Sequence, residues 1–441
     1  MRLTPLLATT VLALGASSAT FAQAPPPAGA PNPDDVLGNL VVAAAGGGRA
    51  LPKIGVLPSL AADPEDVTVH SVMRRDLDLC GEFEVLPDSA APEGLYLSDS
   101  PIDAKAWTAK GVEAVVKVTA KRAANNQAEV RAQAYLTKSG QTPVYDKRFL
   151  VPESGLRVEA HHLADLVIGA LTGLNGGFAS HLAFSSATGP IRRVFTIDAD
   201  GDDPRAVSPQ GLSAIGPAFG KNEELFYAAA PPDDLYRVYG ASGTPVPLSV
   251  KGSVYGLAFS KDRSAVAASI GIGATINVFS GPDLGHLSQA SPVGMAIHPT
   301  FTPSGKLAFV GEGKWGQRVY VDGKPISAEG LFASSPTFCN NPNGVRAVFA
   351  VGVGKDTDLV STGESGGGLA RLTQGQARNG YPACSPDGRL VAFFSTRTSS
   401  EGPGLYVMRL DGGRPKRIST MLGDSLRWDA LPPSAAVELK N

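Results

Sequence analysis

The sequence has little cysteine, no dominant charge and no long apolar run beyond its first residues. The three cysteines, Cys80, Cys339 and Cys384, are an odd number, which excludes a framework in which every cysteine is paired. We favour three small buried thiols, with Cys339–Cys384 as the one pair worth testing. Lysine and arginine total 39 and aspartate and glutamate 41, so we expect no basic surface for nucleic acid.

The first residues carry the only pattern that concerns a membrane. Residues 1–24 combine Arg2, a short apolar stretch and small residues, as a secretory signal peptide does. Cleavage after Ala24 is one possibility and cleavage after Ala22 the other. No cysteine lies near either site, so a lipid anchor is not expected, and no later run reaches the roughly 20 apolar residues of a spanning helix. We therefore predict an exported protein that meets membranes only indirectly.

Glycine and proline are abundant, with 51 and 35 residues, beside 43% hydrophobic residues. That much apolar material can build a core, so the glycines and prolines indicate tight turns rather than disorder. The length of 441 residues favours two or three domains. Only the proline-rich residues 25–38 are expected to form a flexible segment.

A short phrase recurs along the second half of the chain at a period of about 40 residues, which is typical of β-propeller blades. The fourth residue of each copy is, in order, Phe219, Phe259, Phe301, Phe338, Cys384 and Leu431. Each copy reads as an inner strand, a glycine-containing turn and further short strands rich in valine, phenylalanine and tyrosine. Residues 181–209 lack an inner strand, and residues 426–433 offer a spare one. We predict that the chain end completes the first blade, giving six blades over 176–433 and a tail at 434–441.

Residues 39–175 follow a different pattern. A strand at 53–60 precedes a helix that opens at Asp63-Pro64-Glu65 and stops at Gly81. Three successive strands and a long amphipathic helix complete the region. This alternation predicts a small α/β domain.

Several phrases resemble the TolB family of the Tol-Pal system. They are IGVLPSL (54–60), AWTAKGVEAVVKVTA (106–120), LTGLNGGFASHLAF (171–184) and the blade that begins YPACSPDGRLVAFFS (381–395). The resemblance covers roughly residues 39–433. It implies a two-domain fold, in which a small α/β N-terminal domain precedes an all-β six-bladed β-propeller closed by the C-terminal strand.

The same resemblance implies a function. Members of this family are non-enzymatic periplasmic scaffolds that support outer-membrane integrity and envelope constriction during cell division. One propeller mouth binds the peptidoglycan-associated lipoprotein Pal, and the N-terminal segment binds TolA and some bacteriocins. In this chain that segment would include Leu40, Val41 and Val42. We expect a monomer without a cofactor; the alternatives are a TolB-like adaptor of another envelope or secretion pathway, and a propeller hydrolase or sugar-binding module.

Residues just before the inner strands should surround one mouth of the propeller channel. They are Ser253, Tyr255, Ile297, His298, Ser334, Ser335, Asn379 and Tyr381. Tyrosine and histidine make good interface anchors, because each has an apolar body and a polar tip. The alternative is that these side chains only pack between blades.

Two glycine motifs look catalytic but stand in the wrong context. Residues 363–367 match G-x-S-x-G and residues 311–316 match G-x-G-x-x-G. A nucleophile elbow and a dinucleotide loop both require a following helix, whereas strand-forming sequence follows each motif here. We interpret both as turns and predict no catalytic residue.

Two further groups could hold a metal ion. Asp198, Asp200 and Asp202 resemble a calcium loop, but a proline stands where the loop's bidentate acid belongs, so we favour a hairpin turn and leave calcium open. His161 and His162 are adjacent on a predicted helix and diverge from one another. We expect them on a solvated helix face and predict no metal site.

Overall fold

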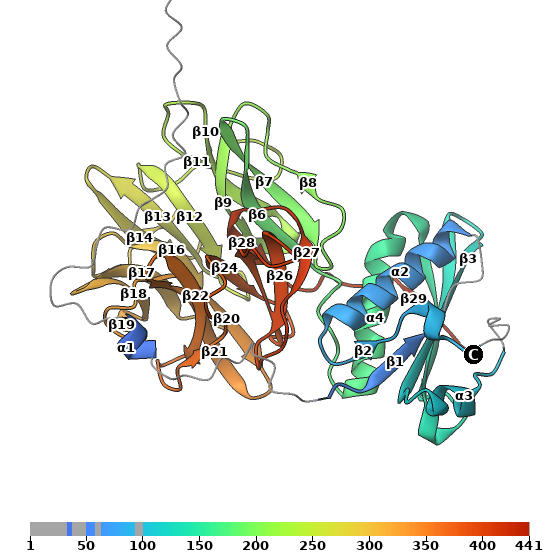
Figure 1. The fold of residues 1–441 in the computed structure, drawn as a ribbon. Helices are drawn as coiled ribbons and strands as arrows, with labels where there is room; N and C mark the ends of the chain where they lie inside the picture. Colours follow the sequence, from blue (N-terminus) through green and yellow to red (C-terminus); the bar gives the residue numbers. More distant parts are fainter. Residues whose placement is uncertain (1–32, 38–49, 58–62, 93–99, 441) are drawn as a thin grey trace, which may run out of the picture.

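The computed structural model describes residues 33–37, 50–57, 63–92 and 100–440. Figure 1 shows a ring of small sheets beside a smaller body in which helices cover a sheet. The predicted signal peptide and the segment Leu40–Val42 lie outside the described residues. Within the described part, no helix has both the length and the apolar character that crossing a bilayer requires.

The smaller body is built on one six-stranded sheet in the order β2-β1-β3-β4-β5-β29. Its strands are β1 Lys53–Val56, β2 Glu84–Val85, β3 Ala114–Ala123, β4 Gln127–Leu136, β5 Tyr145–Pro152 and β29 Val437–Leu439. Strand β1 pairs in parallel with β2 and β3, and the other neighbours are antiparallel. The predicted α/β domain is confirmed, and the sheet's outermost strand comes from the predicted C-terminal tail.

Two long helices, α2 (Pro64–Leu79) and α4 (Leu156–Thr172), pack against each other and against this sheet. Proline at the first position of α2 costs no hydrogen bond, and Gly81 adopts a left-handed φ of 68° just beyond the helix end. Val69, Met73 and Leu77 are fully buried, as their helical spacing predicts. The short helix α3 (Ala104–Ala109) packs through Trp107 against Val115 and Tyr135 of the sheet.

The larger body is a propeller of six blades, which confirms the predicted fold. In order they are blade one (β28, β6, β7, β8), blade two (β9–β11), blade three (β12–β15), blade four (β16–β19), blade five (β20–β23) and blade six (β24–β27). The strand bounds are β6 His181–Thr188, β7 Ile191–Asp198, β8 Arg205–Ala206, β9 Ser213–Phe219, β10 Leu225–Ala230, β11 Arg237–Tyr239, β12 Ser253–Phe259, β13 Val266–Ile272, β14 Thr275–Gly281, β15 Ser288–Gln289, β16 Ile297–Phe301, β17 Leu307–Gly313, β18 Gly316–Val321, β19 Lys324–Pro325, β20 Ala333–Asn341, β21 Gly344–Val353, β22 Asp356–Gly363, β23 Ala370–Arg371, β24 Asn379–Cys384, β25 Leu390–Ser395, β26 Gly404–Arg409, β27 Lys416–Ser419 and β28 Asp424–Trp428.

The ring closes between the end of the chain and its first propeller strand. Strand β28 pairs antiparallel with β6, with Trp428 opposite Leu182. Cys384 lies opposite Val391 in the same way in blade six, so Trp428 is the true equivalent of the recurring aromatic. Our alignment on Leu431 was therefore wrong by three residues; Leu431 lies beyond the strand and is exposed. With the corrected alignment, Arg427 occupies the position directly before the aromatic residue in the sixth copy of the repeat.

The inner strands of blades five and six are joined by a disulfide between Cys339 and Cys384. Cys80 is free and buried at the end of α2. Our preference for three free thiols was wrong for this pair, because the propeller brings together two strands that are 45 residues apart in the sequence.

A short N-terminal helix, α1 (Pro33–Leu37), lies against the propeller rather than against the α/β domain (Figure 1). Leu37 is fully buried in an apolar cluster that includes Val310 and Phe349, of blades four and five. The chain thus contacts the propeller before it enters the α/β domain at β1.

Candidate functional site

The inner strands share a feature that shapes one channel mouth. Each of the six breaks register with its neighbour at the same place, as a β-bulge does. In five of them the bulge holds a residue with left-handed backbone, with φ between 51° and 58°: Gly216, His298, Ser335, Tyr381 and Ser425. His298 and Tyr381 thus each occupy the bulge of an inner strand.

Four of the predicted rim residues, Tyr255, His298, Ser335 and Tyr381, meet at this mouth. Tyr255, His298 and Tyr381 line one narrow hollow, together with Arg427. The rings of His298 and Tyr381 stand edge to face with centroids 6.3 Å apart. Tyr255 is 43% exposed, which is unusual for a large aromatic side chain. These residues offer apolar surface and hydrogen-bonding tips to a molecule that covers the mouth.

The environment of His298 fixes its charge. Its Nδ1 accepts a hydrogen bond from the backbone N–H of Ser335 at 3.2 Å, which leaves Nε2 as the protonated nitrogen. Burial and the nearby charge of Arg427 lower the pKa of His298 to about 4. The imidazole is therefore neutral at physiological pH and acts as a donor at the mouth.

The other predicted rim residues serve the blades instead. Asn379 is fully buried, and its side-chain amide donates to the carbonyl of Thr357 at 3.2 Å. The Ser253 hydroxyl is buried and accepts from the backbone N–H of Tyr236 at 3.2 Å. Ile297 packs against the apolar cluster between blades four and five, and Ser334 is half-buried in β20. Ser253 and Asn379 therefore do not lie at the rim as predicted. Both side chains face into a blade, because side chains alternate between the two faces of a strand.

The three aspartates that resemble a calcium loop all pair with one arginine. Arg157 of α4 contacts all three carboxylates, with nitrogen–oxygen distances of 2.6 Å to Asp198, 2.6 Å to Asp200 and 3.3 Å to Asp202. The hairpin between β7 and β8 is thereby bound to the α/β domain. The loop takes part in the domain interface.

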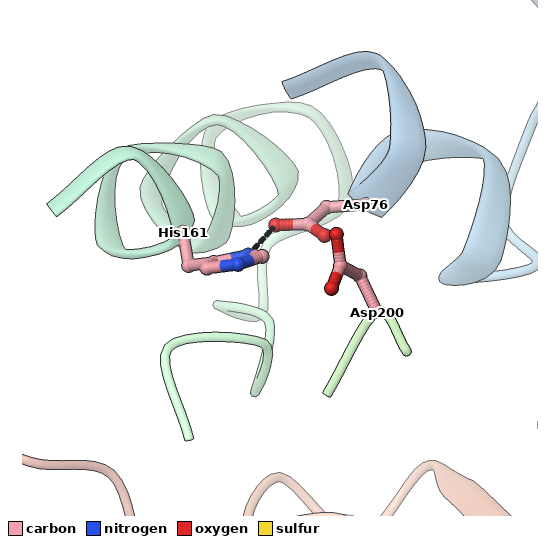
Figure 2. Close-up of side chains that lie close together, drawn as sticks. All are labelled: Asp76, His161 and Asp200. Carbon is pink, nitrogen blue, oxygen red and sulfur yellow. Dashed lines mark hydrogen bonds and ion pairs between the residues drawn. The ribbon is translucent and has the colours of Figure 1, made fainter. Parts of the chain in front are cut away.

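His161 lies in the same interface, so our expectation of a solvated face was wrong for this residue. Only 2% of it is exposed, and its Nδ1 lies 2.6 Å from Oδ2 of Asp76 (Figure 2). Burial opposes its charge, but the carboxylates of Asp76 and Asp198 outweigh burial and raise the pKa of His161 to about 10. Asp76, His161 and Asp200 each present an atom within 4.8 Å of the others, a spacing that one metal ion could bridge. Arg157 and the protonated His161 already supply two cations there.

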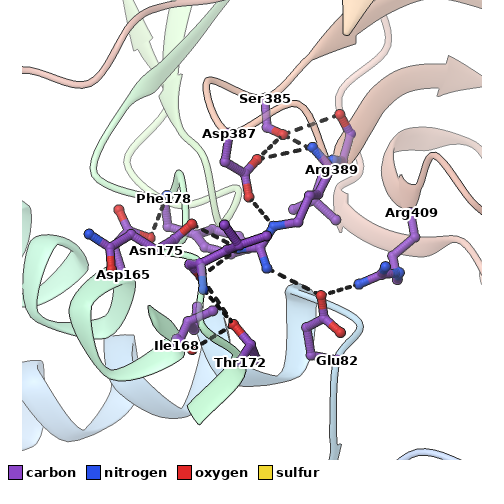
Figure 3. A network of polar contacts seen from close by, with 12 residues as sticks. Glu82, Asp165, Ile168, Thr172, Asn175, Phe178, Ser385, Asp387, Arg389 and Arg409 are labelled. Carbon is purple, nitrogen blue, oxygen red and sulfur yellow. Dashed lines mark hydrogen bonds and ion pairs between the residues drawn. The ribbon is translucent and has the colours of Figure 1, made fainter. Parts of the chain in front are cut away.

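A second part of the domain interface is shown in Figure 3. Arg389 of blade six donates to the carbonyl of Asn175 at 2.8 Å and lies 3.2 Å from the carboxylate of Glu82. Glu82 also pairs with Arg409. On the helix side, the carboxylate of Asp165 accepts from the backbone N–H of Phe178 at 2.9 Å. Glu82, Arg389 and Arg409 border a cleft of about 490 Å³ between the two bodies.

The comparisons with known proteins now bear on identity. Residues 40–142 match the family model described as the TolB amino-terminal domain. A protein of Acinetobacter baylyi named "Tol-Pal system protein TolB" is 32% identical over 174 residues, or 38% of this chain. The N-terminal part of the chain thus carries a TolB amino-terminal domain. The match spans 39% of the length of that TolB relative.

A comparison with solved structures shows similarity of fold over both domains. The crystal structure of TolB from Acinetobacter baumannii superposes with a TM-score of 0.68 at 20% sequence identity. The match covers 86% of this chain and 96% of the other. Both domains of the TolB fold are therefore present, and in the same order.

Proposed function

We propose that this protein is a non-enzymatic, periplasmic scaffold of the Tol-Pal system, and that it binds a Pal-type lipoprotein over the propeller mouth. The observation that carries the proposal is the hollow where Tyr255, His298 and Tyr381 meet, on a TolB fold. An exposed tyrosine beside a neutral histidine is typical of a protein-binding surface. The signal-peptide pattern of residues 1–24 supports export.

A TolA-type protein would bind the segment that contains Leu40, Val41 and Val42. This proposal is supported by what flanks the segment. On one side α1 packs on the propeller through Leu37, and on the other β1 enters the sheet of the α/β domain. A partner that takes hold of the segment would thus act on both bodies at once.

The test of the mouth uses the variant Tyr255→Ala/His298→Asn. Asparagine tolerates left-handed backbone, and its Oδ1 can replace Nδ1 as the acceptor for Ser335, so the bulge is kept. The exported chain is titrated by calorimetry with the soluble domain of the Pal-type lipoprotein from the same cell. We expect affinity to fall at least about tenfold, as for the loss of interface anchors, with an unchanged melting temperature.

The matched control is Val67→Ala, since Val67 is 51% exposed on α2, in the other domain. It should bind as the parent does. If the parent protein does not bind the lipoprotein, the proposal is wrong. If the mouth variant binds it as tightly as the parent protein does, the interface does not lie at the mouth. Replacing Leu40, Val41 and Val42 with serine should abolish binding of the TolA-type protein and spare that of the lipoprotein.

A further inference from the structure

The propeller axis is lined by one equivalent position from each blade, directly before the recurring aromatic. The six residues are Ala218, Ala258, Thr300, Thr337, Ala383 and Arg427. Strand pairing establishes the equivalence: Thr300 lies opposite Ala308, Ala383 opposite Ala392 and Arg427 opposite Ala183, each one place before the aromatic position. Five positions are small, and the sixth carries a long cation.

Arg427 crosses the channel without meeting an acid. Its Nη2 donates to the carbonyl of Pro299 in blade four at 3.2 Å and approaches that of Leu257 in blade three at 3.4 Å. In the described part of the chain no carboxylate forms an ion pair with it. Burial lowers its pKa to about 10, and the guanidinium therefore stays charged at neutral pH.

These residues line a cavity of about 130 Å³. At a share of about 30 Å³ per water molecule, the space is roughly that of four waters. None of the described residues that line it is acidic, and the charge of Arg263, the other arginine, is balanced by Asp429 at 3.0 Å. Thr300 and Thr337, which each carry a hydroxyl group, lie on the wall in neighbouring blades.

We propose that this axial cavity binds one small oxyanion, such as inorganic phosphate or formate, between the guanidinium of Arg427 and the hydroxyls of Thr300 and Thr337. A buried charge is costly unless it is paired, and backbone carbonyls supply only partial charge. The planar guanidinium matches an oxyanion with two parallel hydrogen bonds, and hydroxyls can donate to the remaining oxygens. Arg427 borders both this cavity and the hollow at the mouth, whereas Thr300 and Thr337 line the cavity alone, and the anion binds without a partner protein.

The test is calorimetric titration of the exported chain with phosphate and, separately, with formate. Ionic strength is held with gluconate, whose bulk the cavity does not admit. The parent protein should bind one anion, and Arg427→Met should lose at least about tenfold in affinity, as expected for a charge-assisted contact. Arg427→Lys keeps the charge and should retain part of the binding. Arg205→Met is the matched control, because Arg205 is exposed and paired with Asp203 on the surface, and it should bind as the parent does.

A second variant tests the site in case Arg427→Met does not fold. Thr300→Val/Thr337→Val preserves side-chain volume and strand propensity but removes both donors. It should weaken binding several-fold at an unchanged melting temperature. If Arg427→Met binds the anion as tightly as the parent protein does, the proposed site is wrong. If Arg427→Met does not fold, equal binding by the double valine variant leads to the same conclusion. The absence of saturable binding of both anions by the parent protein would also overturn the site.

Discussion

His161 of α4 and Asp76 of α2 are joined by a buried 2.6 Å hydrogen bond at the point where the α/β domain meets the propeller (Figure 2). Asp198 and Asp200 approach this pair from the hairpin after β7, and Arg157 binds both. The packing of the two domains therefore depends on charge. That dependence can be measured.

The first prediction concerns Asp76→Asn. The substitution leaves the charge of His161 without its closest partner in a dry interface, and removing one member of a buried pair costs roughly 3–5 kcal/mol. Urea unfolding followed by circular dichroism should show this loss. Asp88→Asn is the control, since Asp88 pairs with Arg74 at 2.7 Å on the surface, where such pairs contribute at most about 1 kcal/mol. Equal effects of the two substitutions would contradict a buried ion pair.

The second prediction is a loss of stability in alkali. The pKa of His161 is about 10 in the folded protein and 6.5 as its ordinary value, so the folded state holds a proton that the unfolded state has released. The stabilisation is complete below pH 6.5 and disappears as pH rises through 10, with a slope of up to about 1.4 kcal/mol per pH unit. Burial raises the pKa of Asp76 to about 6, so most of its titration falls below this window.

Unfolding free energies measured between pH 6.5 and 10 check this expectation. His161→Gln is the reference, because it keeps a polar side chain but cannot titrate. The slope should be present in the parent protein and absent in the variant. Parallel curves would show that another group is responsible.

The third prediction concerns the disulfide between β20 and β24. A bridge that closes a loop of 45 residues restricts the unfolded chain by about 4 kcal/mol in the loop-entropy description. Cys339→Ala/Cys384→Ala should lower the free energy of unfolding by a comparable amount and remove its dependence on reductant. The parent protein treated with dithiothreitol is the internal comparison. If the reductant does not change the stability of the parent protein, the two cysteines are not paired in the cell.

The fourth prediction tests the return of the chain to the first domain. Removing residues 434–441 deletes β29, and with it the pairing of Val437 opposite Leu150 and the hydrogen bond from the Ser434 hydroxyl to Glu159 at 2.6 Å. Strand β5 then becomes an open edge. Hydrogen exchange should accelerate in residues 145–152 and remain unchanged in the propeller. Val437→Ala keeps the backbone pairing and should leave the exchange of β5 as it is.

The propeller could be predicted because its repeat is local. Glycine-containing turns, alternating strands and a period of about 40 residues are all visible within single blades. The α/β domain was predictable for the same reason, with Pro64 and Gly81 marking the limits of α2. Arg427 was missed because the sixth copy is only half a blade, and the phrase that starts at Trp428 imitates the repeat three residues late.

His161, Asn379 and Cys339 were misjudged for another reason. Whether the face of a strand or helix is covered depends on which element packs on it, and sequence spacing does not reveal that. His161 is covered by α2 and by a propeller hairpin. Asn379 turns into its blade, where it bonds to Thr357. Cys339 meets a residue 45 positions away.

The sequence by itself determined the six-bladed ring, its closure by the chain end and the α/β domain in front of it, because turn chemistry and side-chain periodicity act over a few neighbouring residues. Only the tertiary structure decided which side chains share a space. Three features arise where segments far apart in the sequence converge. They are the contact of Tyr255, His298 and Tyr381 at one mouth, the ion cluster around His161, and the charge of Arg427 on the axis. Contacts of that kind depend on how whole domains pack, and no local pattern encodes them.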